Sequence, residues 1–230
     1  MFYGFDIYYF VLVVPALIFT VYAQFKVKGT FNKYRSYNNW RGYTGADVAR
    51  EILNRNGLYN VAVEPTPGEL TDHYDPRTRV VRLSEVVYHS TSLAAIGVAA
   101  HETGHAIQHK VGYAPLVLRS TLIPAANIGT TLGFPLAFIG FFMGFPQLIN
   151  IGIILYTAAV AFLVVTLPVE FNASSRARSI LEASGAFSRD ELVPVKKVLN
   201  AAAMTYVAAA LVAIANLLRL VLLANNRRDE

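Results

Sequence analysis

The chain has 230 residues and a formal net charge of +5; 54% of its residues are hydrophobic, only 15% are charged, and its mean hydropathy is +0.41. Because soluble domains carry about 25% charged residues, this composition argues against a soluble globule and more strongly against a disordered chain. The chain has no cysteine, which excludes disulfides, thiolate metal sites and a cysteine nucleophile.

Four apolar blocks are each long enough to cross a membrane, which takes about 20 residues. Residues 1–24 are predicted to form a transmembrane anchor; a cleaved signal peptide is the competing interpretation, but no basic residue precedes the apolar run. Residues 114–167 contain two blocks separated by a short uncharged turn, which indicates a transmembrane hairpin. Residues 201–224 form the last predicted span, before a tail at 225–230, and we expect Arg219 to extend from this span toward the membrane surface.

Two polar segments, residues 25–113 and 168–200, indicate the orientation of the chain. The first has 11 Lys and Arg against 8 Asp and Glu, and the second has 5 against 4, so together they hold +4 of the net charge of +5. Basic residues concentrate in the cytoplasmic loops of membrane proteins. We therefore expect both segments to lie on the cytoplasmic face, and the positive charge to reflect orientation and not nucleic-acid binding.

The first polar segment is predicted to be a small α+β unit. A helix is expected over residues 44–56, beginning at a threonine that forms a capping box with the aspartate three positions on. Short β-like runs follow at 61–63 and 79–83, and a second helix is expected from about 92 to 110, with an apolar first half. The predicted fold is thus a mainly α membrane protein with about four transmembrane helices and a small cytoplasmic α+β unit. The second polar segment is expected to be helical.

The second helix of this unit contains the sequence His101-Glu102-Thr103-Gly104-His105, an H-E-x-x-H motif. Residues four apart lie on the same face of a helix, so two imidazoles at this spacing can bind one Zn²⁺. Glu102 would lie beside the metal without binding it, and would act as a general base. Two surface histidines with an incidental glutamate are the competing interpretation, which the apolar first half of the helix disfavours. Gly104 is unusual because glycine in a helix interior costs about 1 kcal/mol relative to alanine.

Zinc in a catalytic site needs a third protein ligand. Glu170 is the best candidate, because it follows the third apolar block and two spans return the chain to the face that carries the histidines. A carboxylate that is simply solvated at the membrane surface is the competing interpretation. His109 is four residues beyond His105, but three histidines at this spacing extend too far along a helix to reach one ion. We expect His109 to be structural, and His73 and His89 to lie in loops or packing positions.

The residues around these motifs resemble those of the YugP-type bacterial neutral zinc metallopeptidases. HtpX-like and CAAX prenyl proteases are more distantly similar, and they too place a membrane hairpin between the H-E-x-x-H helix and a glutamate in an E-x-x-A-D context. Ser174 stands here where that wider group has aspartate, which leaves open whether a ligand histidine keeps the hydrogen bond that an aspartate would provide. The similar stretches extend over most of the chain: Asp75–Pro76, Val80–Ser84, Ala99–His109, Glu170–Ala177 and Ala201–Ala210.

The resemblance implies an integral membrane zinc metallopeptidase of the gluzincin type in the bacterial cell membrane, with a zincin-like cytoplasmic unit. One Zn²⁺ per chain would be bound by His101, His105 and Glu170, and Glu102 would be the general base. The implied partners are a peptide or protein substrate associated with the membrane, the lipid bilayer and other membrane proteins. Similar enzymes bind the substrate backbone along a sheet edge, and the candidate edge strand here is Arg79–Leu83.

Three other functions fit parts of the sequence. An intramembrane protease of the site-2 type would need an aspartate ligand within an apolar segment, and no apolar segment here holds a central aspartate. A transporter would need charges inside the membrane, whereas Arg119 and Arg219 lie near the ends of their spans. A non-catalytic membrane adaptor that retains a zinc site stays as the alternative. The candidates for stabilising an oxyanion are Arg176, Arg178, His73 and Tyr206, although we expect the two arginines to set the membrane topology instead.

Overall fold

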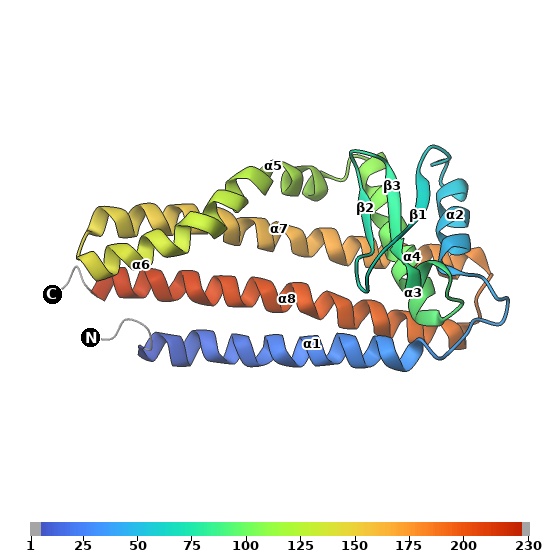
Figure 1. Cartoon of the computed structure of the whole chain (residues 1–230), viewed down its shortest axis with the longest axis horizontal. Helices are drawn as coiled ribbons and strands as arrows, with labels where there is room; N and C mark the ends of the chain where they lie inside the picture. Colours follow the sequence, from blue (N-terminus) through green and yellow to red (C-terminus); the bar gives the residue numbers. More distant parts are fainter. Residues whose placement is uncertain (1–5, 227–230) are drawn as a thin grey trace. The chain divides into compact units, whose positions relative to one another are not determined.

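The computed structural model describes residues 6–226, and most of them are helical (Figure 1). The chain divides into two compact units. The first unit comprises residues 1–24, 117–168 and 205–230, and the second comprises residues 25–116 and 169–204. Each unit is described in turn below.

The described residues contain four helical segments that are long and apolar enough to cross a membrane: Tyr9–Tyr34, Ala114–Met143, Pro146–Ser184 and Arg189–Asn226. Together with a small three-stranded sheet, they confirm the predicted mainly α membrane protein with a small α+β unit. The helices are longer than the apolar runs. For example, α7 (Pro146–Ser184) continues past Pro168 through residues that are polar but favour helix. Apolar length therefore indicates the membrane span and does not locate the end of the helix.

The first unit contains a helical hairpin. Its first arm consists of α5 (Ala114–Ile128), the π-helical η2 (Gly129–Gly133) and α6 (Phe134–Met143), and α7 forms the second arm. The chain reverses at Gly144, whose φ of +71° is a left-handed conformation that favours glycine. A Cβ atom on Gly152 would lie 2.3 Å from the backbone nitrogen of Ala137. Only glycine fits there, and the two arms pack with their backbones in close contact, as membrane helices often do.

Arg219, on α8 (Arg189–Asn226), is buried in the first unit and has a partner that the sequence did not reveal. Its Nε and Nη2 atoms donate to Asp6 Oδ2 at 2.9 and 2.7 Å. The guanidinium carbon lies 5.1 Å from the centroid of the Tyr9 ring. Tyr9 is the first residue of the π-helical η1 (Tyr9–Val13), which continues into α1 (Val14–Tyr34). A charge within a membrane segment is costly unless it is paired, so this contact joins the first and last spans.

We expect Asp6→Ala to lower the free energy of unfolding by on the order of 2 kcal/mol, because it leaves a buried guanidinium without its carboxylate. The double variant Asp6→Ala/Arg219→Leu should recover part of that loss, because it removes the unpaired charge as well. Thermal unfolding of the purified protein in detergent measures both. A double variant that is less stable than Asp6→Ala would contradict this assignment.

The second unit begins with the C-terminal part of α1 and then forms α2 (Gly45–Arg55). The predicted capping box is confirmed: Thr44 Oγ1 accepts a hydrogen bond from the backbone N–H of Asp47 at 3.1 Å, and Asp47 Oδ2 accepts one from the backbone N–H of Thr44 at 2.9 Å. Such a box satisfies backbone donors that have no partner within the helix. Gly57 follows the helix with a φ of +64°, which suits its predicted place at the helix end.

The sheet of the second unit has the strand order β1-β3-β2. β3 (Val80–Ser84) pairs in parallel with β1 (Ala62–Thr66) and antiparallel with β2 (His73–Asp75). The prediction that the strand at Arg79–Leu83 is a free edge is therefore wrong, because β3 is central and both of its sides are paired. The edges are β1 and β2. β2 was not predicted, because the strand is only three residues long and largely polar.

The helix α4 (Leu93–Lys110) is the central element of the second unit, with α2 and the strands beside it (Figure 1). It begins where Ser92 Oγ accepts a hydrogen bond from the backbone N–H of Ala95 at 3.2 Å, and a short helix, α3 (Glu85–Tyr88), precedes it. One apolar core surrounds its first half. That core gathers side chains from α2, β3, α4, α7 and α8, including Leu53, Leu83, Ile96, Leu181 and Val195.

Candidate metal centre

The H-E-x-x-H motif lies on α4 where the apolar core gives way to a more open face. The predicted helix is confirmed, and it places His101 and His105 on one face with their ring centroids 4.8 Å apart and their planes at 87°. Both side chains are 13% exposed. The pair is therefore accessible at one side only, and the interpretation as two solvated surface histidines does not fit this burial.

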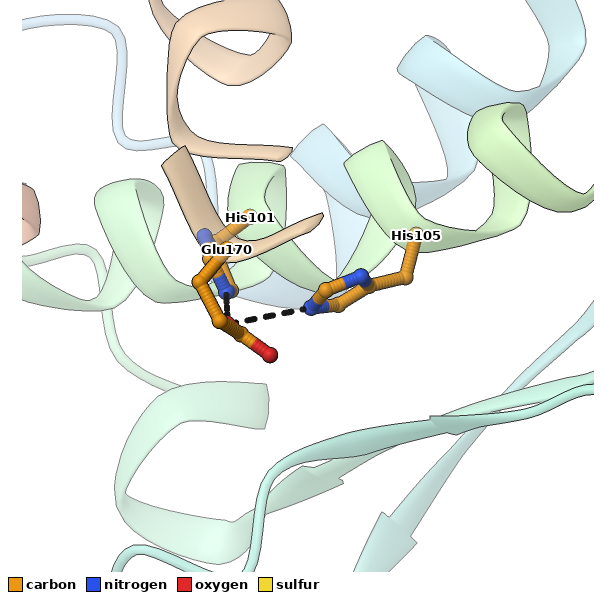
Figure 2. A group of neighbouring side chains, drawn as sticks. All are labelled: His101, His105 and Glu170. Atoms are coloured by element: carbon orange, nitrogen blue, oxygen red, sulfur yellow. Dashed lines mark hydrogen bonds and ion pairs between the residues drawn. The ribbon is translucent and has the colours of Figure 1, made fainter. Parts of the chain in front are cut away.

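Glu170, on α7, lies against both histidines (Figure 2). Its Oε2 atom is 3.2 Å from His101 Nε2 and 3.5 Å from His105 Nε2. The side chain is buried, which does not fit the interpretation of Glu170 as a carboxylate solvated at the membrane surface. One candidate ligand atom from each of the three residues lies within 4.8 Å of the other two. The structure thus brings Glu170 together with two histidines that lie 65 and 69 residues before it in the sequence.

Gly104 explains how the two helices come so close. A Cβ atom on this residue would lie 2.7 Å from the carbonyl oxygen of Ala173 on α7, a distance that real Cβ contacts do not reach. Because the obstructing atom belongs to the backbone, no side-chain rotation relieves the clash. Gly104 lowers the helix propensity of α4, but it allows the backbone of α7 to approach the backbone of α4.

The three side chains fit a zinc ion in donor type, and the two separations that involve Glu170 fit it in spacing. Ligand atoms bound to tetrahedral zinc at about 2.0–2.2 Å lie roughly 3.2–3.6 Å from one another. The two measured separations from the Glu170 oxygen, 3.2 and 3.5 Å, fall in that range. Two imidazole nitrogens and one carboxylate oxygen are also a donor set that leaves a fourth position open in catalytic zinc sites.

The other ring nitrogens of both histidines have hydrogen-bond partners. His101 Nδ1 lies 3.1 Å from Ser174 Oγ, and His105 Nδ1 lies 3.0 Å from Gln108 Oε1. These contacts orient each imidazole so that Nε2 faces Glu170. Ser174 therefore makes a contact at the position where the wider group has aspartate, and a hydroxyl serves in place of a carboxylate.

Gln108 was not identified as a site residue from the sequence. It is fully buried, and its Nε2 donates to the carbonyl oxygen of Val169 at 2.8 Å and to Asn172 Oδ1 at 3.0 Å. The same Asn172 oxygen accepts a hydrogen bond from Arg176 Nε at 2.8 Å. One amide thus orients His105 and also fastens α4 to the turn of α7 that carries Glu170. The available signal was a glutamine within a helix whose other buried positions, apart from Glu102, are small or apolar.

Glu102 is buried but does not belong to the group of three. Burial alone would lower the pKa of His105, but the hydrogen bond to Glu170 and the negative charges of Glu102 and Glu170 raise it above its ordinary value. The surroundings of His105 are therefore strongly negative. Such an environment favours a cation at the histidines, whether a proton or a metal ion.

The other histidines considered as ligands lie outside the group, as expected. His109 Nδ1 is 2.8 Å from the hydroxyl of Tyr74 on β2. His73 Nδ1 is 2.7 Å from the carbonyl oxygen of Thr71, and the ring of His89 packs against Tyr88 with centroids 4.8 Å apart. Each of them has a structural contact that needs no metal.

Comparison with known proteins identifies the class to which this fold and site belong. Residues 9–225 match the family described as "Putative neutral zinc metallopeptidase", and the chain belongs to that family. The chain is also 53% identical over 220 residues to the "Putative membrane protease YugP" of Bacillus subtilis (strain 168), a match that covers 95% of this chain and 97% of that protein. No solved structure matches.

We expect Gly104→Ala to lower the free energy of unfolding by on the order of 2 kcal/mol, because the added methyl group forces α4 and α7 apart. Gly97→Ala, on the same helix, is the matched control: its Cβ atom would meet Val195 at ordinary contact distances, the nearest being 3.4 Å to Cγ1. The control should be as stable as the wild type or slightly more so. Thermal unfolding of both full-length variants makes the comparison, and equal stability of the two would refute the close-approach argument.

Proposed function

We propose that the protein is an integral membrane zinc metalloendopeptidase of the gluzincin type that hydrolyses peptide bonds of membrane or membrane-proximal proteins. One observation carries this proposal: His101, His105 and Glu170 converge on one point, and Glu102 lies buried next to the first histidine in the sequence. Membership of a zinc metallopeptidase family and the name of the Bacillus relative support it.

His101 and His105, through Nε2, and Glu170, through a carboxylate oxygen, would bind one zinc ion per chain. When bound, zinc would polarise the scissile carbonyl and lower the pKa of an attacking water toward 7. Ser174 and Gln108 would hold the imidazoles in the orientation that presents Nε2. The hydrogen bonds from Gln108 to Val169 and Asn172 on α7 would limit the movement of Glu170 during turnover.

Glu102 would act as the proton carrier. Its position directly after His101 on α4 places the carboxylate beside the three ligands without making it one of them. It would take the proton from the attacking water and deliver it to the leaving amine. Because Glu102 is only 9% exposed, few bulk water molecules would reach its carboxylate and exchange the proton that it carries.

The substrate class follows from the surroundings of the site. The segments that hold the site, residues 25–113 and 168–200, alternate along the chain with the four apolar blocks and carry most of the positive charge. By the positive-inside rule they face the cytoplasm, in a bacterial cell membrane. The substrates would therefore be peptide segments on or near the cytoplasmic surface of membrane proteins, and such proteins are the partners we expect.

Glu102→Gln distinguishes the enzyme from a non-catalytic adaptor that keeps a zinc site. We expect this variant to retain zinc, because residue 102 is not a ligand, and to lose hydrolysis by a factor of about 10²–10⁴, the contribution of a general base. Zinc content by elemental analysis and cleavage of membrane proteins by quantitative proteomics of membrane fractions measure the two quantities. Unchanged cleavage by Glu102→Gln would overturn the mechanism, and a wild type that binds zinc without turnover would favour the adaptor.

Glu170→Ala tests the ligand set, with His109→Ala as its matched control. Replacing Glu170 should reduce zinc affinity by at least about tenfold in competition with a chelator, because one of three protein ligands is lost. Replacing His109 should leave zinc affinity unchanged, since its contact is with Tyr74. If the two variants exchanged these results, His109 would be the third ligand.

A further inference from the structure

The second unit contains a cavity of about 470 Å³ that the proposed zinc chemistry does not use. It lies at the corner between the end of α7 and the first turns of α8. Its polar lining comes from Arg178, Glu182, Arg189 and Lys196. None of these residues belongs to the group of possible metal ligands. The volume is within the range of small-molecule sites.

The cations that line this cavity have no carboxylate partner. No ion pair joins Arg178, Arg189 or Lys196 to any of the described acidic residues, although Glu182 stands one helical turn from Arg178. Glu191, one of two acids in the first turn of α8 beside Asp190, is engaged elsewhere: its carboxylate accepts hydrogen bonds from Ser188 and from the backbone N–H of Trp40. With three cations and one anion, the lining carries a net charge of +2.

The unpaired side-chain donor of Arg178 is a second and independent reason to expect a ligand in this cavity. Its Nε atom is buried and makes no hydrogen bond within the part of the chain that the structure describes. Buried donors are almost always paired in folded proteins, because a lost hydrogen bond is costly. The neighbouring arginine on the same helix illustrates the normal case, since Arg176 Nε donates to Asn172. Arg178, which lines the cavity, therefore has a donor that no described group of the chain satisfies.

We propose that this cavity binds a phosphate group carried on an apolar body. A phosphate monoester has a charge close to −2 at neutral pH and three acceptor oxygens, which complements a lining of +2 with two guanidinium groups and an ammonium. Arginine is the side chain best suited to bidentate phosphate binding. The remaining wall is apolar and includes Phe187, Leu192 and Val195, so it offers a surface for the rest of the ligand.

The site does not depend on the proposed peptidase activity, but an occupant would touch the helix that carries Glu170. Arg178 is eight residues beyond Glu170 on α7, which is about 12 Å along the helix axis. Val195, in the cavity wall, faces Gly97 of α4, where a Cβ atom would lie 3.4 Å from Val195 Cγ1. The cavity is therefore bounded by residues that pack on both helices of the metal centre.

The test is calorimetric titration of inorganic phosphate into the full-length protein in detergent and phosphate-free buffer at constant ionic strength. We expect saturable binding of about one phosphate per chain, with affinity about tenfold weaker in Lys196→Ala, the loss of one charge-assisted contact. Lys197→Ala is the matched control, because it removes the adjacent exposed charge of the same helix without changing the cavity lining. Arg178→Gln should abolish binding. The two lysine variants keep the proposal testable if Arg178→Gln does not fold.

Absence of saturable binding at millimolar phosphate would overturn the proposal, as would equal affinities in the two lysine variants. Repeating the titration in nanodiscs identifies the source of the phosphate. If the group belongs to a lipid headgroup, discs that contain phosphatidic acid will abolish the phosphate signal, while discs of phosphatidylcholine alone will retain it. Equal signals in both kinds of disc would support a soluble phosphate ester as the ligand.

Discussion

The backbone of α4 at Gly104 meets the backbone of α7 at Ala173 with no room for a Cβ atom between them. The geometry of the candidate metal centre depends on this contact. It brings Glu170 within reach of two histidines that α4 already places on one face. Gln108 then fixes the same two helices by hydrogen bonds, so that close packing sets the distance between the helices and a buried amide sets their register.

This arrangement places ionisable side chains in the protein interior, where folded proteins usually avoid charge. Two carboxylates, Glu102 and Glu170, are buried beside two imidazoles, and taking such groups out of water is costly unless their charges are balanced. The histidines and their hydrogen-bond partners balance part of that charge. A divalent cation would balance it more fully, which is why the strength of the metal site and the stability of the second unit are expected to be coupled.

The sequence was sufficient where a local pattern determines the outcome. The spans follow from apolar length, the capping box at Thr44 from its residue types, and the facing histidines from the helical period. It was insufficient where the outcome depends on elements far apart in the chain. The central place of β3 depends on a third strand too short to recognise, and the pairing of Arg219 depends on Asp6, some two hundred residues away. Gln108 was missed for the same reason, since its partners lie on another helix.

The unbroken course of α7 has a further consequence for how sequences of this kind can vary. From Pro146 to Glu170 and on to Ser184 the chain is one helix, with no loop to absorb a change in length. Each residue of a helix turns the next by about 100°, so inserting or deleting one residue between Glu170 and Ala173, whose backbone contacts Gly104 of α4, would rotate the carboxylate away from the histidines. The number of residues in this stretch of helix therefore determines the direction in which the Glu170 carboxylate points. An insertion of about seven residues, or two full turns, would restore that direction but would move Glu170 about 10 Å along the helix axis, away from the histidines.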